Sequence, residues 1–329
     1  MPTFPIDFSN WLSTLPTEES FPRISPARAY AHAEDQYDIQ YGQEVVSLSD
    51  GEGLCHLLKK LGINIAHPAL EVGCGSGKLT AGLANAYPGP GCLATDASPA
   101  FLRLAQKKLA SALSPDRMPQ FAIMNGGDLG RLPPGMISLI AMRSTLHHIL
   151  DVEGFISDCS NALCARGALA MAAEPCESGY VLMGAVAQGI IPVLAQAGIA
   201  VSGEWRRQIE LFTANMKFYC RRDLDKSAAE DKHLFRVFEM SALGEKYGLH
   251  LHFYPNAAFE DFDANGESHP QHERFAKFML NYLRYCMSFD LKLVEVIKQH
   301  MHDHLSYIEE CYSGHLGPIV TGTFLFEKK

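Results

Sequence analysis

The feature that most constrains the fold is a glycine loop, E-V-G-C-G-S-G at residues 71–77, between two regular patterns. A strand-like apolar run, residues 69–73, leads into it, and a helical pattern follows over residues 78–87, where Pro88 stops it. Glycines remove the side chains that would keep a ligand away from backbone N–H groups at such a turn. The loop therefore indicates a nucleotide site at the end of a strand.

Two common nucleotide loops do not fit these residues. A phosphate-binding P-loop has the pattern G-x-x-x-x-G-K-[ST], but Val72 stands five places before Gly77, and Leu79 follows Lys78. A dinucleotide fingerprint, G-x-G-x-x-G, would need glycine where Lys78 stands. What remains is an acidic residue followed by three alternate glycines.

Short apolar runs alternate with helical patterns between residues 68 and 175, which is typical of βαβ units and a parallel sheet. The expected strands cover residues 69–73, 92–95, 121–124, 136–142, 168–173, 249–254 and 319–327. Mostly helical blocks at residues 176–231 and about 270–312 interrupt the alternation, and no low-complexity linker marks a boundary. We interpret both blocks as insertions in one sheet.

Acidic residues follow the second and third of these strands. A carboxylate at Asp96 can accept both ribose hydroxyls of a nucleoside laid over the loop. Asp128, in G-G-D-L at residues 126–129, suits a hydrogen bond to an exocyclic amine such as adenine N6. Three such features at three successive strand ends are more specific than the loop alone.

Residues 68–175 resemble class I S-adenosylmethionine (SAM)-dependent methyltransferases. The motifs are L-E-V-G-C-G-S-G, A-T-D-A-S, G-G-D-L-G-R-L-P, L-H-H-I-L-D and A-R-G-A-L-A-M-A-A-E-P. The resemblance implies sheet order 3-2-1-4-5-7-6 with an antiparallel seventh strand. The expected fold is thus α/β, with a doubly wound seven-stranded sheet and helical lid insertions.

The resemblance also implies how SAM is held. The glycine loop would hold its methionine part, Asp96 the ribose and Asp128 the adenine, and Glu71 would reach toward the amino group through backbone or water. The expected cofactor-binding residues are Glu71, Gly73, Cys74, Gly75, Gly77, Asp96, Ala97, Gly127, Asp128, Leu129, Arg143 and Tyr37.

The residues after the fourth strand, R-S-T-L-H-H at 143–148, are expected to face the acceptor, because ligands bind beyond the carboxyl ends of such strands. His147 or His148 is predicted to act as a base or a hydrogen-bond donor, unless the pair only packs under the loop. Arg143 would contact the methionine carboxylate or the substrate. Glu174 either faces the pocket or is a plain loop carboxylate.

Two further patterns are weaker. Tyr30, Tyr37 and Tyr41 share a helical face, which more often packs in a core, although Tyr37 or Tyr41 touching the cofactor is the alternative. His300 and His304 have metal-ligand spacing on a helix, but Met301 stands where the two-histidine zinc motif has glutamate. We therefore predict no metal.

The expected organisation is an N-terminal helical cap at 1–62, a SAM-binding core at 63–175, a helical lid insertion at 176–231, and the rest of the core at 232–329 with a helical insertion at 256–315. Aromatic and apolar residues are frequent in both insertions. They predict an enclosed, partly apolar pocket for a small molecule.

Net charge, cysteine content and one uncharged segment limit which partners and which location are expected. A net charge of −9 disfavours nucleic acid. Nine scattered cysteines without a C-x-x-C pair, and no secretory pattern at residues 1–10, predict a cytoplasmic protein. Residues 180–202 carry no charge and are long enough to span a bilayer, but two glutamines, Pro192 and several glycines favour a buried helix pair or a homodimer interface.

The sequence thus predicts a SAM-dependent methyltransferase acting on a small-molecule acceptor, with oxygen favoured as the accepting atom. Two alternatives remain. One is a SAM-binding enzyme of other chemistry, such as a SAM-modifying synthase or decarboxylase. The other is a non-catalytic partner protein that keeps the fold. Degenerate members usually lose the glycines or the ribose acid, and this sequence keeps both.

Overall fold

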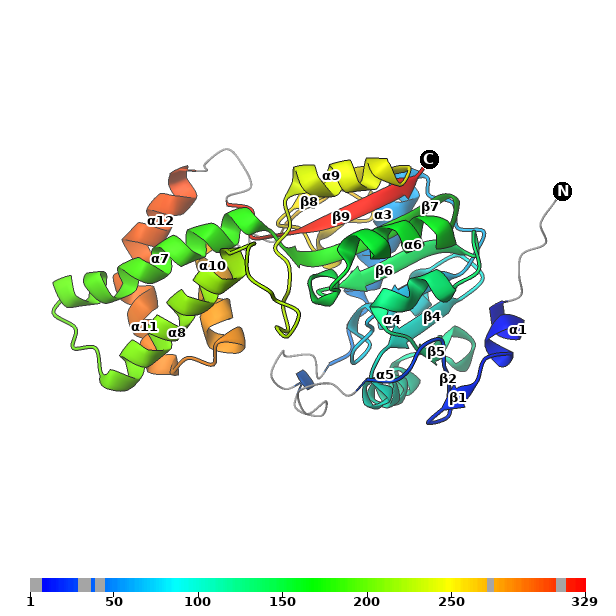
Figure 1. Ribbon diagram of the computed structural model, residues 1–329, viewed down its shortest axis with the longest axis horizontal. Coiled ribbons are helices and arrows are strands. Elements are labelled where there is room, and N and C mark those ends of the chain that lie inside the picture. Colours follow the sequence, from blue (N-terminus) through cyan, green and yellow to red (C-terminus); the bar gives the residue numbers. More distant parts are fainter. Residues whose placement is uncertain (1–7, 29–36, 39–44, 271–274, 312–317) are drawn as a thin grey trace.

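A seven-stranded sheet forms the centre of the computed structural model, which describes residues 8–28, 37–38, 45–270, 275–311 and 318–329 (Figure 1). Its order is β5-β4-β3-β6-β7-β9-β8, and only β9 runs antiparallel to its neighbours. The strands are β3 (Ala69–Val72), β4 (Cys92–Asp96), β5 (Gln120–Ile123), β6 (Ile137–Arg143), β7 (Leu163–Pro175), β8 (Leu249–Pro255) and β9 (Thr321–Lys328). The expected sheet order and its antiparallel strand are confirmed.

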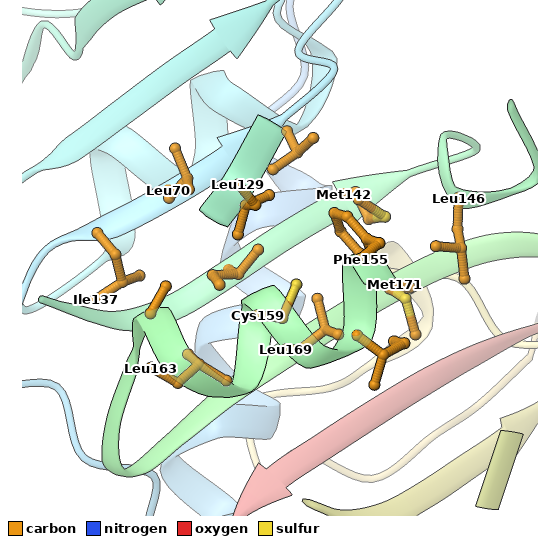
Figure 2. Packing of buried hydrophobic residues seen from close by; sticks show 14 of the residues in the cluster. Leu70, Leu129, Ile137, Met142, Leu146, Phe155, Cys159, Leu163, Leu169 and Met171 are labelled. Atoms are coloured by element: carbon orange, nitrogen blue, oxygen red, sulfur yellow. The ribbon is translucent and has the colours of Figure 1, made fainter. Parts of the chain in front are cut away.

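Helices cover both faces of this sheet. One face carries α3 (Ser49–Leu61), α4 (Lys78–Ala86) and α5 (Pro99–Ala112), and the other carries α6 (Val152–Ala162) and α9 (Val237–Lys246). Figure 2 shows Phe155 and Cys159 of α6 packed against side chains of β6 and β7. The strands are buried on both faces, which explains why they read as continuous apolar runs in the sequence.

Local residues set the helix boundaries close to where the sequence places them. Helix α3 ends at Gly62, whose φ of 65° lets its N–H bond to the carbonyls of Leu58 and Lys59. Helix α5 begins after Ser98, whose side chain accepts a hydrogen bond from the N–H of Phe101, and Pro99 supplies the first helical residue.

The described part of the N-terminal region is not helical throughout, so it departs from the helical cap expected at 1–62. Helix α1 (Phe8–Ser13) is followed by a short hairpin, β1 (Thr17–Glu18) and β2 (Phe21–Pro22). Its turn residues, Glu19 and Ser20, both have positive φ, as a two-residue hairpin turn requires. Neither is glycine or asparagine, so the sequence carries none of the usual signals of such a turn.

The two insertions pack together into one helical lobe beside the carboxyl end of β7 (Figure 1). Its helices are α7 (Glu177–Gln196), α8 (Gly203–Cys220), α10 (Phe275–Asn281), α11 (Leu291–His300) and α12 (His302–Cys311). They share a hydrophobic core of their own, to which both insertions contribute, with Met183, Ile190, Phe212, Phe275 and Leu293 fully buried. Residues 221–236 contain no helix, although the sequence predicts a mostly helical block as far as residue 231.

Helix α7 contains most of the uncharged segment. Within the described part of the chain, it is the one helix long and apolar enough to cross a membrane. One side, including Met183 and Ile190, is buried in the core of the lobe, while Val181 on another side is 54% exposed. The uncharged segment therefore contains one helix in place of the expected helix pair, and this helix is buried over part of its surface.

Gly51 of α3 and Gly82 of α4 allow the two helices to cross in backbone contact. This contact can be tested. A Cβ added at Gly51 would lie 1.8 Å from the backbone N of Leu83, so Gly51→Ala is expected to lower the free energy of unfolding by about 1–3 kcal/mol or more. Gly189→Ala, in α7, is the control: an added Cβ meets nothing within 4 Å, and stability should rise by about 0.5–1 kcal/mol. Urea unfolding measures both. Equal midpoints for Gly51→Ala and the wild type would contradict the close crossing.

Candidate active site

The glycine loop connects β3 to α4 in a conformation that needs glycine. Gly73, Gly75 and Gly77 have φ values of 71°, 51° and 91°, in the left-handed region that other residues rarely adopt. A Cβ at Gly73 would lie 2.6 Å from the side chain of Thr145, whereas a Cβ at Gly75 would meet nothing within 4 Å. The loop is therefore packed on its sheet side and open above Gly75, where a ligand can approach the backbone.

Asp96, at the end of β4, holds this loop from the side. Its Oδ2 accepts a hydrogen bond from the N–H of Gly75 at 2.9 Å, and its Oδ1 accepts one from the N–H of Ser98 at 2.9 Å. Each carboxylate oxygen can accept more than one hydrogen bond, so the group can still bind ribose hydroxyls. Ala97, which follows directly, accepts from the N–H of Arg28 through its carbonyl.

The segment after β5, the third of the expected strands, also leaves open space at one position. A Cβ at Gly127 would meet nothing within 4 Å, and Asp128 forms an ion pair of 3.5 Å with Arg131 at the surface. Two expected cofactor residues instead face the interior: Leu129 is fully buried in the main core, and Cys74 is buried against α5. Their side chains do not line the site, so any contact with a cofactor would come from their backbone.

Glu71 is buried at the base of the loop. Its Oε2 accepts a hydrogen bond of 2.6 Å from the hydroxyl of Thr80, which lies in the first turn of α4. Burial disfavours the charged carboxylate and raises the pKa of Glu71 to about 8, although the Thr80 hydroxyl opposes the shift. The role expected for Glu71 toward the SAM amino group stays a prediction.

Tyr37 lies near the predicted cofactor residues. Its ring contacts Phe101 edge-to-face at 5.2 Å, and burial raises the pKa of its hydroxyl, which is close enough to Arg143 and Asp96 to feel their charges. The neighbouring Asp38 pairs with Lys108 at 2.6 Å, and Lys108 also reaches the loop residue Ser76. These contacts hold residues 37–38 beside the glycine loop. Tyr30 and Tyr41 lie outside the described residues.

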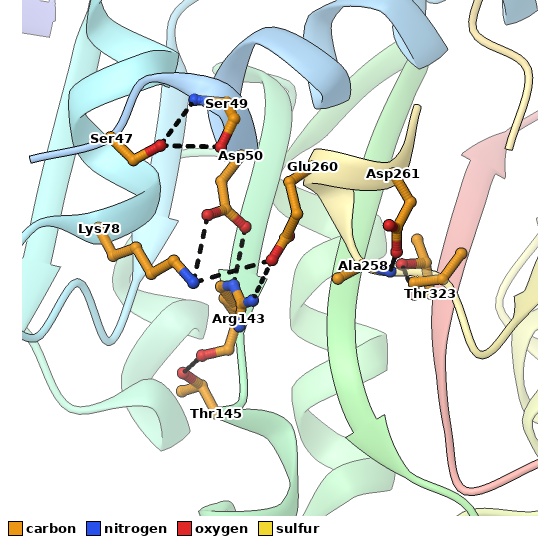
Figure 3. Close-up of polar contacts among 11 residues, drawn as sticks. Ser47, Ser49, Asp50, Lys78, Arg143, Thr145, Ala258, Glu260, Asp261 and Thr323 are labelled. Carbon is orange, nitrogen blue, oxygen red and sulfur yellow. Dashed lines mark hydrogen bonds and ion pairs between the residues drawn. The ribbon is translucent and has the colours of Figure 1, made fainter. Parts of the chain in front are cut away.

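Arg143, at the end of β6, is engaged by two carboxylates (Figure 3). Its Nε donates to Asp50 of α3 at 2.7 Å, and its Nη2 donates to Glu260 at 2.8 Å. Lys78 lies 3.6 Å from Asp50 and 3.8 Å from Glu260. Burial raises the pKa of Asp50 to about 7, whereas the cations outweigh burial at Glu260 and lower its pKa to about 2. The expected contact of Arg143 with cofactor or substrate would compete with these partners.

His147 is held by Glu174 at the ends of β6 and β7. Glu174 is fully buried, and it accepts hydrogen bonds from the N–H groups of Thr145, Leu146 and His147 and lies 2.8 Å from His147 Nδ1. Burial alone would raise its pKa, but His147 and these donors outweigh burial and lower it. At His147 burial opposes protonation, and the Glu174 charge prevails, so the pKa is raised. Glu174 therefore faces the site.

A distortion of β7 aims Glu174 at this turn. Ala173 has a φ of 56°, and the pairing of β7 with β9 shifts register between Met171 and Glu174. Ser144, directly after the neighbouring strand β6, has a φ of 50°. Such irregularities re-aim side chains at strand ends and concentrate at functional sites.

His148 and Asp231 complete this corner. His148 Nδ1 lies 3.0 Å from the carbonyl oxygen of Glu230, and its pKa is lowered by burial and by the neighbouring His147. Asp231 Oδ1 lies 3.5 Å from His147 Nε2. The other histidine pair does not share a face as expected, because α11 ends at His300 and a separate helix carries His304.

Residues 70–169 match the family model described as a methyltransferase domain. This part of the chain is a methyltransferase domain. The open glycine loop, the carboxylate of Asp96 and the open space at Gly127 fit SAM, the cofactor expected for such a domain. A comparison with curated protein sequences gives no match.

Several solved structures are similar to this chain. Phosphoethanolamine N-methyltransferase 2 of Haemonchus contortus, in complex with S-adenosylhomocysteine, is 13% identical with a TM-score of 0.48, over 90% of this chain and 57% of that one. The YcgJ protein of Bacillus subtilis is 12% identical with a TM-score of 0.47, over 85% and 98%. A geranyl diphosphate methyltransferase with SAM is 12% identical with a TM-score of 0.44, over 84% and 86%. The chain thus spans little more than half the length of the Haemonchus protein.

Three residues of the candidate site were missed from the sequence: Asp50, Glu260 and Asp231. Each comes from outside the strand-end motifs, in α3, in the short 3-10 turn Phe259–Asp261, or between α8 and α9. In the sequence, Lys78 serves only to exclude a P-loop and a dinucleotide fingerprint, and no role in the site is predicted for it. No local pattern marks these positions, because their partners lie far away in the chain.

The raised pKa of Glu71 predicts a pH dependence of stability. Between about pH 5 and 8, the unfolded chain has lost this proton and the folded chain keeps it, so wild-type stability should fall as pH rises through that window. Glu71→Gln, a neutral side chain of the same shape, is expected to reduce the fall. Urea unfolding at both ends of the window measures the difference.

Glu177→Gln is the matched control for this pH experiment. The pKa of Glu177 is lowered by its hydrogen bond to Arg236, so its stabilising effect is lost only below the ordinary carboxylate range. Its slope between about pH 5 and 8 should therefore match the wild type. If Glu71→Gln also kept the wild-type slope, Glu71 would be ionised in the folded protein.

Proposed function

We propose that the protein transfers the methyl group of SAM to a small-molecule acceptor, with oxygen as the accepting atom. One observation carries the proposal. The open glycine loop with Asp96, and the His147–Glu174 pair, lie at the carboxyl ends of neighbouring strands, as Gly73 packs against Thr145. A cofactor half and an acceptor half therefore meet at one edge of the sheet.

SAM, when bound, supplies a methyl group on a sulfonium centre whose leaving thioether is neutral. The protein's own side chains then position the acceptor and remove its proton. His147 suits this task because Glu174 fixes its ring through Nδ1, which leaves Nε2 facing away from the buried carboxylate. A hydroxyl acceptor needs such a partner, and this need supports oxygen over carbon.

A small acceptor is supported by how the site is enclosed. Tyr37 lies close enough to Arg143 and Glu230 to feel their charges, His148 contacts the carbonyl of Glu230, and the His147 side chain is 12% exposed. The helical lobe stands at the same end of the sheet (Figure 1). A polymer would need a more open groove, and the net charge of −9 would repel a nucleic acid.

We also propose a cytoplasmic location, which is supported by nine cysteines that are all free thiols. A homodimer through the exposed side of α7 stays a prediction. Both can be checked separately from the chemistry, by fractionation of the source cells and by sedimentation of the purified protein.

Calorimetric titration with SAM and with S-adenosylhomocysteine tests the cofactor half. We expect micromolar binding that Asp96→Ala weakens by about tenfold or more, equivalent to ~1.4 kcal/mol for hydrogen bonds to a charged group. Asp116→Ala is the control, because Asp116 is an exposed carboxylate in a 3-10 turn away from the loop, and it should bind like the wild type.

The same titrations decide between the proposed function and a non-catalytic partner. Binding that depends on Asp96 would direct effort to phenols, acids and sugars as acceptors, assayed by the S-adenosylhomocysteine formed. No heat from either ligand, and no competition between them, would overturn the methyl-transfer proposal. Unfolding curves of both variants exclude a general loss of structure.

A further inference from the structure

Three side chains with metal-ligating atoms converge where the sequence predicts none. His147 and His148 come from the turn after β6, and Asp231 comes from the segment between α8 and α9. Asp231 Oδ1 lies 3.5 Å from His147 Nε2 and 3.5 Å from His148 Nδ1. The ligand atoms of all three residues lie within 4.8 Å of one another.

We infer that His147, His148 and Asp231 form a binding site for a divalent transition-metal cation of the Zn²⁺ class. A cation held at about 2.1 Å by tetrahedral ligands separates those ligands by about 3.4 Å. Both distances from Asp231 Oδ1 already have this length, so small ring rotations would complete the set. Two imidazoles and one carboxylate favour zinc, iron or nickel over magnesium, which prefers oxygen ligands.

Glu174 has the position of an outer-shell partner for this site. Metal-bound histidines usually donate their other ring N–H to a carboxylate, which fixes the tautomer and raises the basicity of the ligating nitrogen. His147 Nδ1 lies 2.8 Å from the buried Glu174, so its Nε2 is left to bind a cation on the Asp231 side. Glu174 is itself fixed by three backbone N–H groups.

Backbone contacts hold the two segments of the site together without a metal. The N–H of Lys232 donates to the carbonyl oxygen of His147 at 2.8 Å, and His233 Nε2 lies 3.1 Å from the carbonyl oxygen of Leu150. His148 Nδ1 now contacts the carbonyl of Glu230, and a bound cation would replace that contact. The ligands are therefore largely preorganised, which is what a metal site requires.

The site also leaves room for a further ligand. His148 is 36% exposed and Asp231 33% exposed, so three protein ligands would leave one coordination position open toward the acceptor side. A hydroxyl or carboxylate of the acceptor fits that position, because a cation lowers the pKa of an oxygen that it binds. This inference rests on the proposed function and replaces one step of it: with the cation bound, Nε2 of His147 is a ligand and no longer takes the acceptor's proton, which the lowered pKa of the bound oxygen releases to solvent.

Titration of metal-free protein with Co²⁺ alone tests the inference. We expect one equivalent of Co²⁺ to bind, to give visible absorption bands of a low-symmetry site, and to be displaced by Zn²⁺. Asp231→Ala should weaken binding by about tenfold or more, and Glu174→Gln by about tenfold to a hundredfold. His302→Ala, an exposed histidine of α12, is the control and should bind like the wild type.

Other outcomes would overturn the inference. These are no saturable Co²⁺ binding, or binding that Asp231→Ala and Asp231→Asn leave unchanged, which would mean that the carboxylate only pairs with a protonated His147. Thermal unfolding without metal shows whether the alanine variant folds, and the asparagine variant retains the shape. Calorimetry with SAM on the same samples keeps the two proposals separate, because Asp96→Ala should weaken SAM binding and leave Co²⁺ binding unchanged.

Discussion

The cluster of Arg143, Asp50, Glu260 and Lys78 is the constraint on which the rest of the site depends. Four segments that are distant in the chain meet there: α3, α4, the end of β6 and the turn after β8. Removing one partner of such a buried pair typically costs about 3–5 kcal/mol, because the other charge stays buried alone. The cluster therefore fixes the first turn of α4, and with it the glycine loop, against the strand end that carries the histidines.

Apart from that cluster, the candidate active site is formed by residues at the carboxyl ends of the strands. Gly73 packs on Thr145, so the loop after β3 and the turn after β6 cannot move independently. The distortion at Ala173 brings Glu174 to the same turn. Cofactor loop and histidine turn are thus parts of one rigid edge, and the geometry that binds SAM also sets where an acceptor must lie.

The sequence was most informative where structure is local. The glycine loop, Asp96 and the alternating apolar runs predicted the sheet and its order, because each depends on neighbours in the chain. It failed where partners are remote: nothing near Asp231 indicates that it lies beside His147, and nothing near Glu260 indicates Arg143. Leu129 and Cys74 follow the family motif but point into the core, since a motif gives positions and not side-chain directions. Glu19 and Ser20 form a turn that no local signal marks.

The position of β9 in the sheet has a consequence for assembly. This strand comes last of the seven in chain order, yet it lies between β7 and β8 and forms hydrogen bonds with both. Until it is in place, β8 has no partner strand, and the edge of β7 is open to pairing with another chain. The helical lobe needs residues 275–311 for its core in the same way. A ribosome-bound chain would therefore hold a completed cofactor loop beside an unfinished sheet, and chaperone binding or misassembly would concentrate at β7.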